Sequence, residues 1–221
     1  MDFLTLIDAD FLLVINGWRS LWADYFMYAF SGKIIWIPLY AAILYVLFRN
    51  MPWRVALLGV LTITLIILFA DQTCSSLIRP WIGRMRPANL ENPLSDYIEI
   101  VNGYRGGKYG FPSCHAANTF GLAFYVYYMF RQRWFTLFMM LWALVTCYSR
   151  AYLGVHYPGD LVAGALVGYV GAFICCRLFA FLSAKYLCYV RPAYTVNTWV
   201  PLVVGSLTIL CIFIYSFLSA A

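Results

Sequence analysis

The chain has 221 residues, of which 64% are hydrophobic and only 11% are charged. Soluble domains carry about 25% charged residues, so this composition excludes an ordinary soluble protein and indicates an integral membrane protein. The formal net charge of +6 then bears on membrane topology rather than on binding to nucleic acid, and no nucleic-acid partner is expected.

Residues 1–17 are predicted to form an amphipathic helix in the membrane interface. Asp2, Asp8, Asp10 and Asn16 alternate there with apolar clusters, which suits a helix lying on the membrane better than one crossing it. The segment lacks the basic region and the small-residue cleavage site of a secretory signal. We therefore expect all 221 residues in the mature protein.

Five or six membrane spans are expected after this helix, since each apolar segment is near the roughly 20 residues that cross the hydrocarbon core. The predicted fold is an all-α integral membrane protein with about six transmembrane helices, in a single domain over residues 1–221. Gly164 and Gly168 predict close packing of the fifth span on a neighbouring helix. The expected spans are about 33–49, 54–76, 114–131, 134–150, 160–182 and an extra C-terminal span, 198–218.

The connections between these spans separate by charge. One side carries basic residues and no acidic residue, whereas the other side holds every Asp and Glu of the chain. By the positive-inside rule the basic side is cytoplasmic. We therefore expect a multi-pass protein of the bacterial inner membrane with its functional side chains on the periplasmic face. The basic residues concerned are Arg49, Arg54, Arg131, Arg133, Lys185 and Arg191.

A long connection, residues 88–112, lies on the expected outer side. Its length and its glycines suit either a mobile cover over a site or a plain tether. The seven cysteines show no paired CxxC spacing, so neither a disulfide framework nor a zinc site is predicted.

Arginines gather after the second span, where Arg79, Arg84 and Arg86 stand within eight residues. The planar guanidinium binds phosphate oxygens two at a time, so the cluster suits a phosphate clamp. A single arginine at a membrane end would more simply reach a lipid headgroup. Three arginines with two neighbouring prolines favour the clamp.

Polar residues also mark the starts of two later spans. Ser113 is a predicted N-cap, and a capped helix start presents backbone N–H groups and a positive dipole end to an anion, with His115 beside it. Asp160 follows His156 by four residues, so its carboxylate can accept the imidazole N–H and fix the tautomer. A histidine held in this way can act as a nucleophile or a base. A purely structural His–Asp cap is the alternative.

Together these segments resemble the signature motifs of the type 2 phosphatidic acid phosphatase superfamily of membrane lipid phosphatases. The resemblance covers residues about 20 to 185. Arg79 stands where the family has lysine, and Cys114 stands where it has glycine. The family patterns are Lys-x6-Arg-Pro, Pro-Ser-Gly-His and Ser-Arg-x5-His-x3-Asp, present here as Arg79-x6-Arg86-Pro87, Pro112-Ser113-Cys114-His115 and Ser149-Arg150-x5-His156-x3-Asp160.

The resemblance implies a metal-independent phosphatase that needs no cofactor. In that reaction His156 forms a phosphohistidine, Asp160 orients it, and His115 protonates the leaving oxygen and then serves as the base for water. The phosphate oxygens would be held by Arg79, Arg86, Ser113, Cys114 and Arg150.

The membrane setting favours a lipid phosphate as the substrate. By resemblance to compact bacterial lipid A phosphatases, a phosphate group of lipid A comes first, and undecaprenyl diphosphate and phosphatidylglycerophosphate are the alternatives. A transporter that binds lipid phosphate without cleaving it, and a haem-binding electron carrier, are more remote alternatives. The sequence does not predict the oligomeric state.

Overall fold

The computed structural model describes residues 3–190, 192 and 195–221. Asp2 and Arg191, which the charge pattern included, lie outside the described residues. Across the described ranges the regular structure is helical, apart from one isolated bridge between Met85 and Tyr109. This confirms the predicted all-α class.

The helices follow the expected apolar segments closely. Two short 3-10 helices (Ile34–Trp36 and Pro93–Tyr97) and a π-helical turn, η2 (Gln72–Ile78), lie between the α-helices. The α-helices are α1 (Phe3–Gly17), α2 (Leu21–Phe30), α3 (Ile37–Asn50), α4 (Trp53–Asp71), α5 (Arg79–Ile82), α6 (Cys114–Phe130), α7 (Arg133–Tyr152), α8 (Pro158–Leu187) and α9 (Val200–Ala220).

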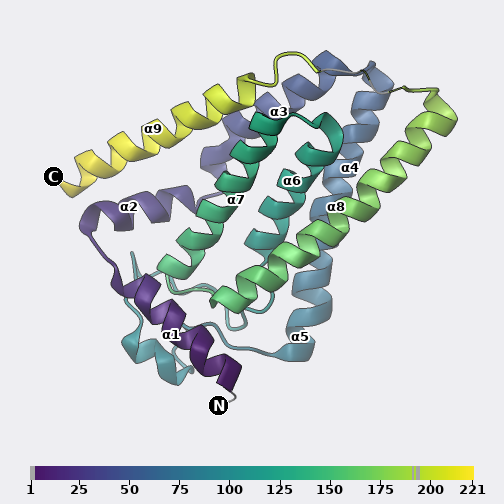
Figure 1. The fold of residues 1–221 in the computed structure, drawn as a ribbon. Coiled ribbons are helices and arrows are strands. Elements are labelled where there is room, and N and C mark those ends of the chain that lie inside the picture. Colours follow the sequence, from purple (N-terminus) through teal and green to yellow (C-terminus); the bar gives the residue numbers. More distant parts are fainter. Residues whose placement is uncertain (1–2, 191, 193–194) are drawn as a thin grey trace.

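Helix α6 is the centre of the bundle. It packs against α7, α8 and α4, while α9 covers α2 and α3 (Figure 1). The core between these helices is filled by large buried side chains such as Trp36, Tyr125 and Met139. Apolar side chains also cover the outer faces, where Leu166 of α8 is 60% exposed and Leu207 of α9 is 55% exposed. Such apolar surfaces are expected of a protein that faces lipid.

The predicted close helix contact is present between α8 and α6. A Cβ atom at Gly164 would lie 2.4 Å from the carbonyl oxygen of Ser113, and one at Gly168 would lie 2.3 Å from that of Ala117. Only hydrogen fits at these positions. The two glycines thus let the backbones of α6 and α8 approach, and this fixes where both helices begin relative to each other.

The number of membrane spans stays a prediction. By length and hydropathy three helical stretches of the described chain could cross a membrane: Trp53–Ile82, Pro158–Leu187 and Val200–Ala220. A fourth arises if α2 and residues 34–50, bent by 67°, form one broken span. The second span was predicted to end near residue 76, but the helix continues to Ile82 through the wider π turn just before Pro80, a residue that cannot donate a backbone hydrogen bond.

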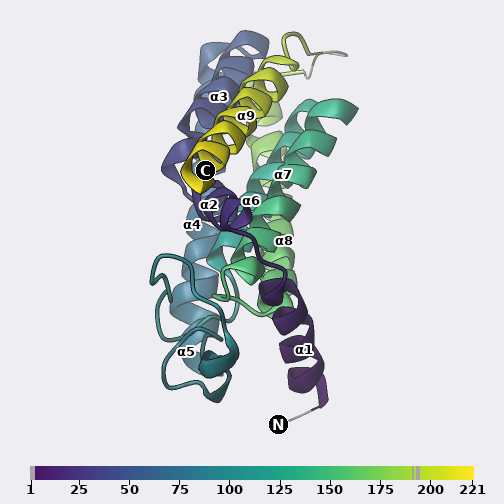
Figure 2. The ribbon, with the colours of Figure 1, turned by 90° about the vertical axis from the view of Figure 1, so that its left-hand side faces the viewer.

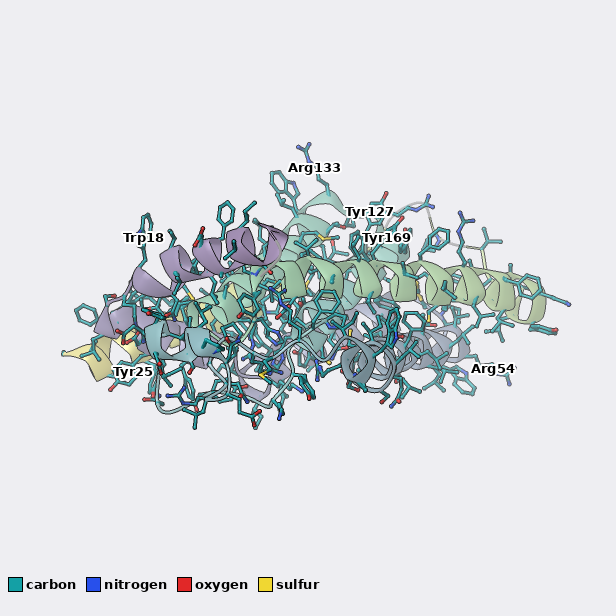
Figure 3. All side chains as sticks on the ribbon, turned by 90° about the horizontal axis from the view of Figure 1, so that it is seen from below. Trp18, Tyr25, Arg54, Tyr127, Arg133 and Tyr169 are labelled. Carbon is teal, nitrogen blue, oxygen red and sulfur yellow. The ribbon has the colours of Figure 1, made fainter. Side chains whose placement is uncertain are left out.

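The connections separate to the two ends of the bundle. Figures 1 and 2 place the α3–α4, α6–α7 and α8–α9 connections at one end, and α1, α5 and the long loop at the other. At this second end Trp18, 77% exposed, points away from the molecule (Figure 3). An exposed tryptophan beside α1 agrees with an interfacial helix, which remains a prediction.

The long loop is bonded to α1 rather than projecting freely. Asn16 of α1 donates to the carbonyl of Glu99 at 3.1 Å and accepts from its N–H at 2.9 Å. Ile98 and Val101 are buried against the same helix and the α7–α8 turn. The loop is therefore held to the body of the protein by hydrogen bonds and buried apolar side chains, and its role as a cover over the site stays a prediction.

Replacing Gly168 with leucine is expected to force α8 away from α6, because overpacking a well-packed contact costs about 1–3 kcal/mol or more. The thermal unfolding midpoint of the detergent-purified protein should fall clearly. Val170→Leu, on an exposed face of the same helix, is the matched control. An unchanged midpoint for Gly168→Leu would contradict the described helix contact.

Candidate active site

The predicted site residues converge at the end of the bundle that carries α1 and α5 (Figure 1). They come from six parts of the fold, so the site forms only when the helices assemble. Arg79 begins α5, Arg86 follows it in the loop, Ser113, Cys114 and His115 begin α6, Arg150 ends α7, His156 lies in the α7–α8 turn and Asp160 lies in the first turn of α8.

His156 is fully buried between a cation and a carboxylate. Its Nε2 lies 2.9 Å from Nη1 of Arg86, and its Nδ1 lies 3.4 Å from Oδ2 of Asp160. Because a guanidinium can only donate, Nε2 must carry the lone pair and the ring proton must reside on Nδ1, toward Asp160. The geometry therefore selects a neutral imidazole whose lone pair points at the arginine cluster.

The surroundings also hold His156 in this neutral form. Burial, together with the positive charges of Arg86 and Arg150, lowers the pKa of His156 well below its usual value of 6.5. Burial and the neighbouring Arg150 similarly lower the pKa of Arg86 to about 10. Cations crowded together inside a protein repel one another, so this arrangement favours an anion among them.

Two of these arginines have donors to spare. Arg79 donates to the carbonyl of Pro112 at 2.9 Å and to Sγ of Cys114 at 3.1 Å. Arg150 donates to Oγ of Ser31 and, at 3.0 Å, to the Tyr104 hydroxyl. Within the described residues, Nε of each arginine is buried without a hydrogen-bond partner. Buried unpaired donors are rare, so both are available to a ligand.

Ser31 and Tyr104 are site residues that the sequence analysis missed. Ser31 follows α2 and Tyr104 lies in the long loop, and neither belongs to a motif. Tyr104 lies so close to Arg150 and Arg86 that their charges lower its pKa despite the opposing effect of burial. Only the glycine content around Tyr104 gave a signal, because it marked the loop as a candidate cover.

Ser113 caps α6 as predicted. Its Oγ accepts from the N–H of Ala116 at 3.4 Å, and its own N–H donates to the carbonyl of Asp160 at 3.0 Å. The second bond ties the start of α6 to the start of α8. The helix start that carries His115 is thereby fixed against the turn that carries His156.

Arg84 has a different place from the one that the arginine cluster suggested. Its Nη1 donates to Oδ1 of Asp160 at 2.9 Å and its Nη2 to Oδ2 of Asp8 at 2.6 Å, while its guanidinium stacks on the ring of Tyr157. Its charge is therefore paired with two carboxylates. Arg84 supports Asp160 and does not join the phosphate clamp.

Asp8 links α1 to the site, which the sequence did not predict. Its Oδ1 accepts from the N–H of Gly159 at 2.8 Å, in the first turn of α8, while its Oδ2 binds Arg84. A carboxylate at a helix N-terminus also interacts favourably with the helix dipole. The helix predicted to lie in the interface thus supports the turn that carries Asp160.

His115 faces a cavity of about 430 Å³ bounded by α3, α4, α6 and α7. The walls are mainly apolar, with Ser31 and His115 at the end near Arg150. Leu44 and Ile67 line the cavity and are 37% and 40% exposed, so it opens between α3 and α4. A lipid whose phosphate binds the arginines could place an acyl chain there.

Asp71 lines the same cavity. Its Oδ1 accepts from Nδ2 of Asn118 at 3.0 Å. No cation within the described residues forms a salt bridge with it. The two side chains meet because α4 and α6 pack directly against each other.

Comparisons with known proteins identify the family and the fold of the chain. Residues 53–184 match the PAP2 superfamily. The chain is 51% identical to a lipid A 4'-phosphatase of Bacteroides thetaiotaomicron over 98% of both chains. A lipid A 4'-phosphatase of Porphyromonas gingivalis is 33% identical over 88% of this chain and 82% of its own length. The crystal structure of Aquifex aeolicus LpxE superposes with a TM-score of 0.57 at 23% identity, covering 76% of this chain and 93% of that one.

The protonation of His156 can be followed by NMR, since the chain has only two histidines and His115→Gln identifies the signal. Burial and the nearby cations favour the neutral ring, so no protonation should occur as the pH is lowered through 6.5. Below that pH the unfolded chain binds a proton that the folded one does not, so this group lowers stability as the pH falls. A midpoint at or above 6.5 would contradict the described environment.

Asp8→Ala is expected to lower the free energy of unfolding by about 1–3 kcal/mol, the usual range for a charged hydrogen bond in a partly buried setting. It removes acceptors from Arg84 and Gly159 together. Asp10→Ala makes the same charge change at an exposed position of α1 and serves as the control. Equal thermal midpoints for the two variants would show that Asp8 does not anchor α1.

Proposed function

Because the chain belongs to the PAP2 superfamily, we propose that it is a lipid A phosphatase that removes a phosphate group through a phosphohistidine. The observation that carries the proposal is the buried, neutral His156, whose lone pair faces Arg86, with the unused Nε donors of Arg79 and Arg150 nearby. The two relatives named lipid A 4'-phosphatases support lipid A as the substrate.

The first step forms a bond between Nε2 of His156 and phosphorus while the ester P–O bond breaks. Arg86 leaves Nε2 and donates instead to the phosphate oxygens, and Asp160 stabilises the imidazolium that forms. His115 gives a proton to the departing oxygen. Water then attacks phosphorus, His115 accepts its proton, the N–P bond breaks, and His156 and free phosphate are released.

The remaining contacts stabilise the transferred group. The free Nε donors of Arg79 and Arg150 are suited to oxygens whose charge is redistributed in the transition state. The Ser113 hydroxyl only accepts in its cap bond, so its proton is available, and the N–H of Cys114 lies at the start of α6. No step in this mechanism needs a metal or a cofactor.

We also propose that the protein lies in the bacterial inner membrane with this site on the periplasmic face. The site occupies the end of the bundle opposite the basic connections (Figure 2), and basic connections mark the cytoplasmic side. Lipids whose phosphates reach that leaflet would then have direct access to the site.

The decisive test is phosphate release by the detergent-purified protein, in EDTA, from lipid A, undecaprenyl diphosphate and phosphatidylglycerophosphate. Release from lipid A is expected to be the fastest. His156→Ala should abolish release yet still bind orthovanadate, whereas Arg150→Ala should lower kcat/KM about 100-fold and weaken vanadate as well.

Arg133→Ala is the control, since this exposed arginine begins α7 at the other end of the bundle (Figure 1). Full activity in His156→Ala would refute the nucleophile. Faster phosphate release from undecaprenyl diphosphate than from lipid A would identify undecaprenyl diphosphate as the preferred substrate. Vanadate binding without release from any lipid would favour a lipid-phosphate transporter.

A further inference from the structure

The polar pair Asp71 and Asn118 lies inside an otherwise mainly apolar cavity. Asp71 ends α4, and Asn118 lies on α6 three residues after His115, one turn further into the bundle. Side chains three apart share a helix face. The pair therefore lies one turn beyond His115 in a cavity that Lys33 and Thr119 also line.

This pair offers acceptors without matching donors. Nδ2 of Asn118 is used on Asp71, but Oδ1 of Asn118 is buried with no hydrogen-bond partner in the described part of the chain. Within the described residues, Asn118 is the sole side-chain donor to the Asp71 carboxylate, although a carboxylate can accept several hydrogen bonds. Buried polar atoms are nearly always paired, so Oδ1 of Asn118 calls for an N–H or O–H group from outside the protein, and the Asp71 carboxylate beside it can accept another.

The cavity connects the pair to the phosphate site. His115 and Ser31 line it at one end, and Ser31 accepts from Arg150. Beyond Asp71 and Asn118 the walls are mainly apolar, with Ile63, Ile67 and Leu122. A ligand with its phosphate on the arginines would pass His115, then the acceptors, and then the apolar region.

We propose that Asp71 and Asn118 form a subsite for the hydroxyl and amide N–H groups of an N-acylated amino sugar next to the phosphate that is removed. The inference rests on the proposed function and names the residues that select its substrate. An acylated glucosamine phosphate has donors beside its phosphate and acyl chains beyond them, which is the order of the cavity. A polyprenyl diphosphate has apolar chain at that position and would leave the acceptors unpaired.

Binding of the sugar can be separated from catalysis. Two ligands are titrated into the detergent-purified protein by thermophoresis: lipid A that lacks its phosphates, and undecaprenyl phosphate, which has no donor in its chain. In Asp71→Leu/Asn118→Leu both polar partners are replaced by apolar groups of similar size, so no orphaned group remains and folding is expected. The dissociation constant of the sugar lipid should rise about 10- to 100-fold, whereas that of undecaprenyl phosphate should not rise.

Asp71→Asn, which keeps the shape of the pair, provides a second variant with a smaller expected loss. Thr62→Val is the control, because Thr62 is buried on the same helix, donates to the Leu58 carbonyl and lies away from the cavity lining. An equal rise for both ligands, or no rise for the sugar lipid, would overturn the subsite. If the double variant loses affinity for the sugar lipid alone, but the wild type releases no phosphate from any lipid, the subsite stands and the proposed phosphatase activity is refuted.

Discussion

The site depends on keeping one imidazole neutral between a guanidinium and a carboxylate. Arg86 can only donate and Asp160 can only accept while ionised, so together they fix the proton of His156 on Nδ1. Each partner is itself held. Arg86 donates to the carbonyls of Tyr109 and Val155, and Asp160 accepts from Arg84 and from the N–H of Tyr157. The proposed nucleophile is thus oriented by its neighbours before any substrate is present.

The helix packing serves this arrangement. The glycines of α8 bring its backbone onto α6, and the bond from Ser113 to Asp160 joins the first turns of the two helices. His115 and His156 belong to segments that meet only at this junction. The long loop and α1 then close the site from outside, through Tyr104 and through Asp8 with Arg84. The packed helices thus hold the candidate site residues in place at the polar end of the bundle.

The sequence predicted what depends on local pattern and missed what depends on distant partners. Hydropathy located the helices, and the GxxxG pair predicted the contact of α8, whose partner is α6. The separate tasks of Arg84 and Arg86 could not be predicted, because two arginines two residues apart look alike until Asp8 and Asp160 are placed around them. Asp8 and Gly159 are 151 residues apart, and Asp71 pairs with Asn118 only because α4 packs on α6.

The contact between Arg79 and Cys114 changes how the two unusual motif positions are understood. The guanidinium donates to the thiol sulfur at 3.1 Å, so the residue that replaces lysine touches the residue that replaces glycine. The same nitrogen, Nη2, also donates to the Pro112 carbonyl at 2.9 Å. Glycine at position 114 would offer no side-chain acceptor for it. The two departures from the family motifs are therefore in direct contact in the fold, although a motif search that treats positions as independent would count them as two separate mismatches.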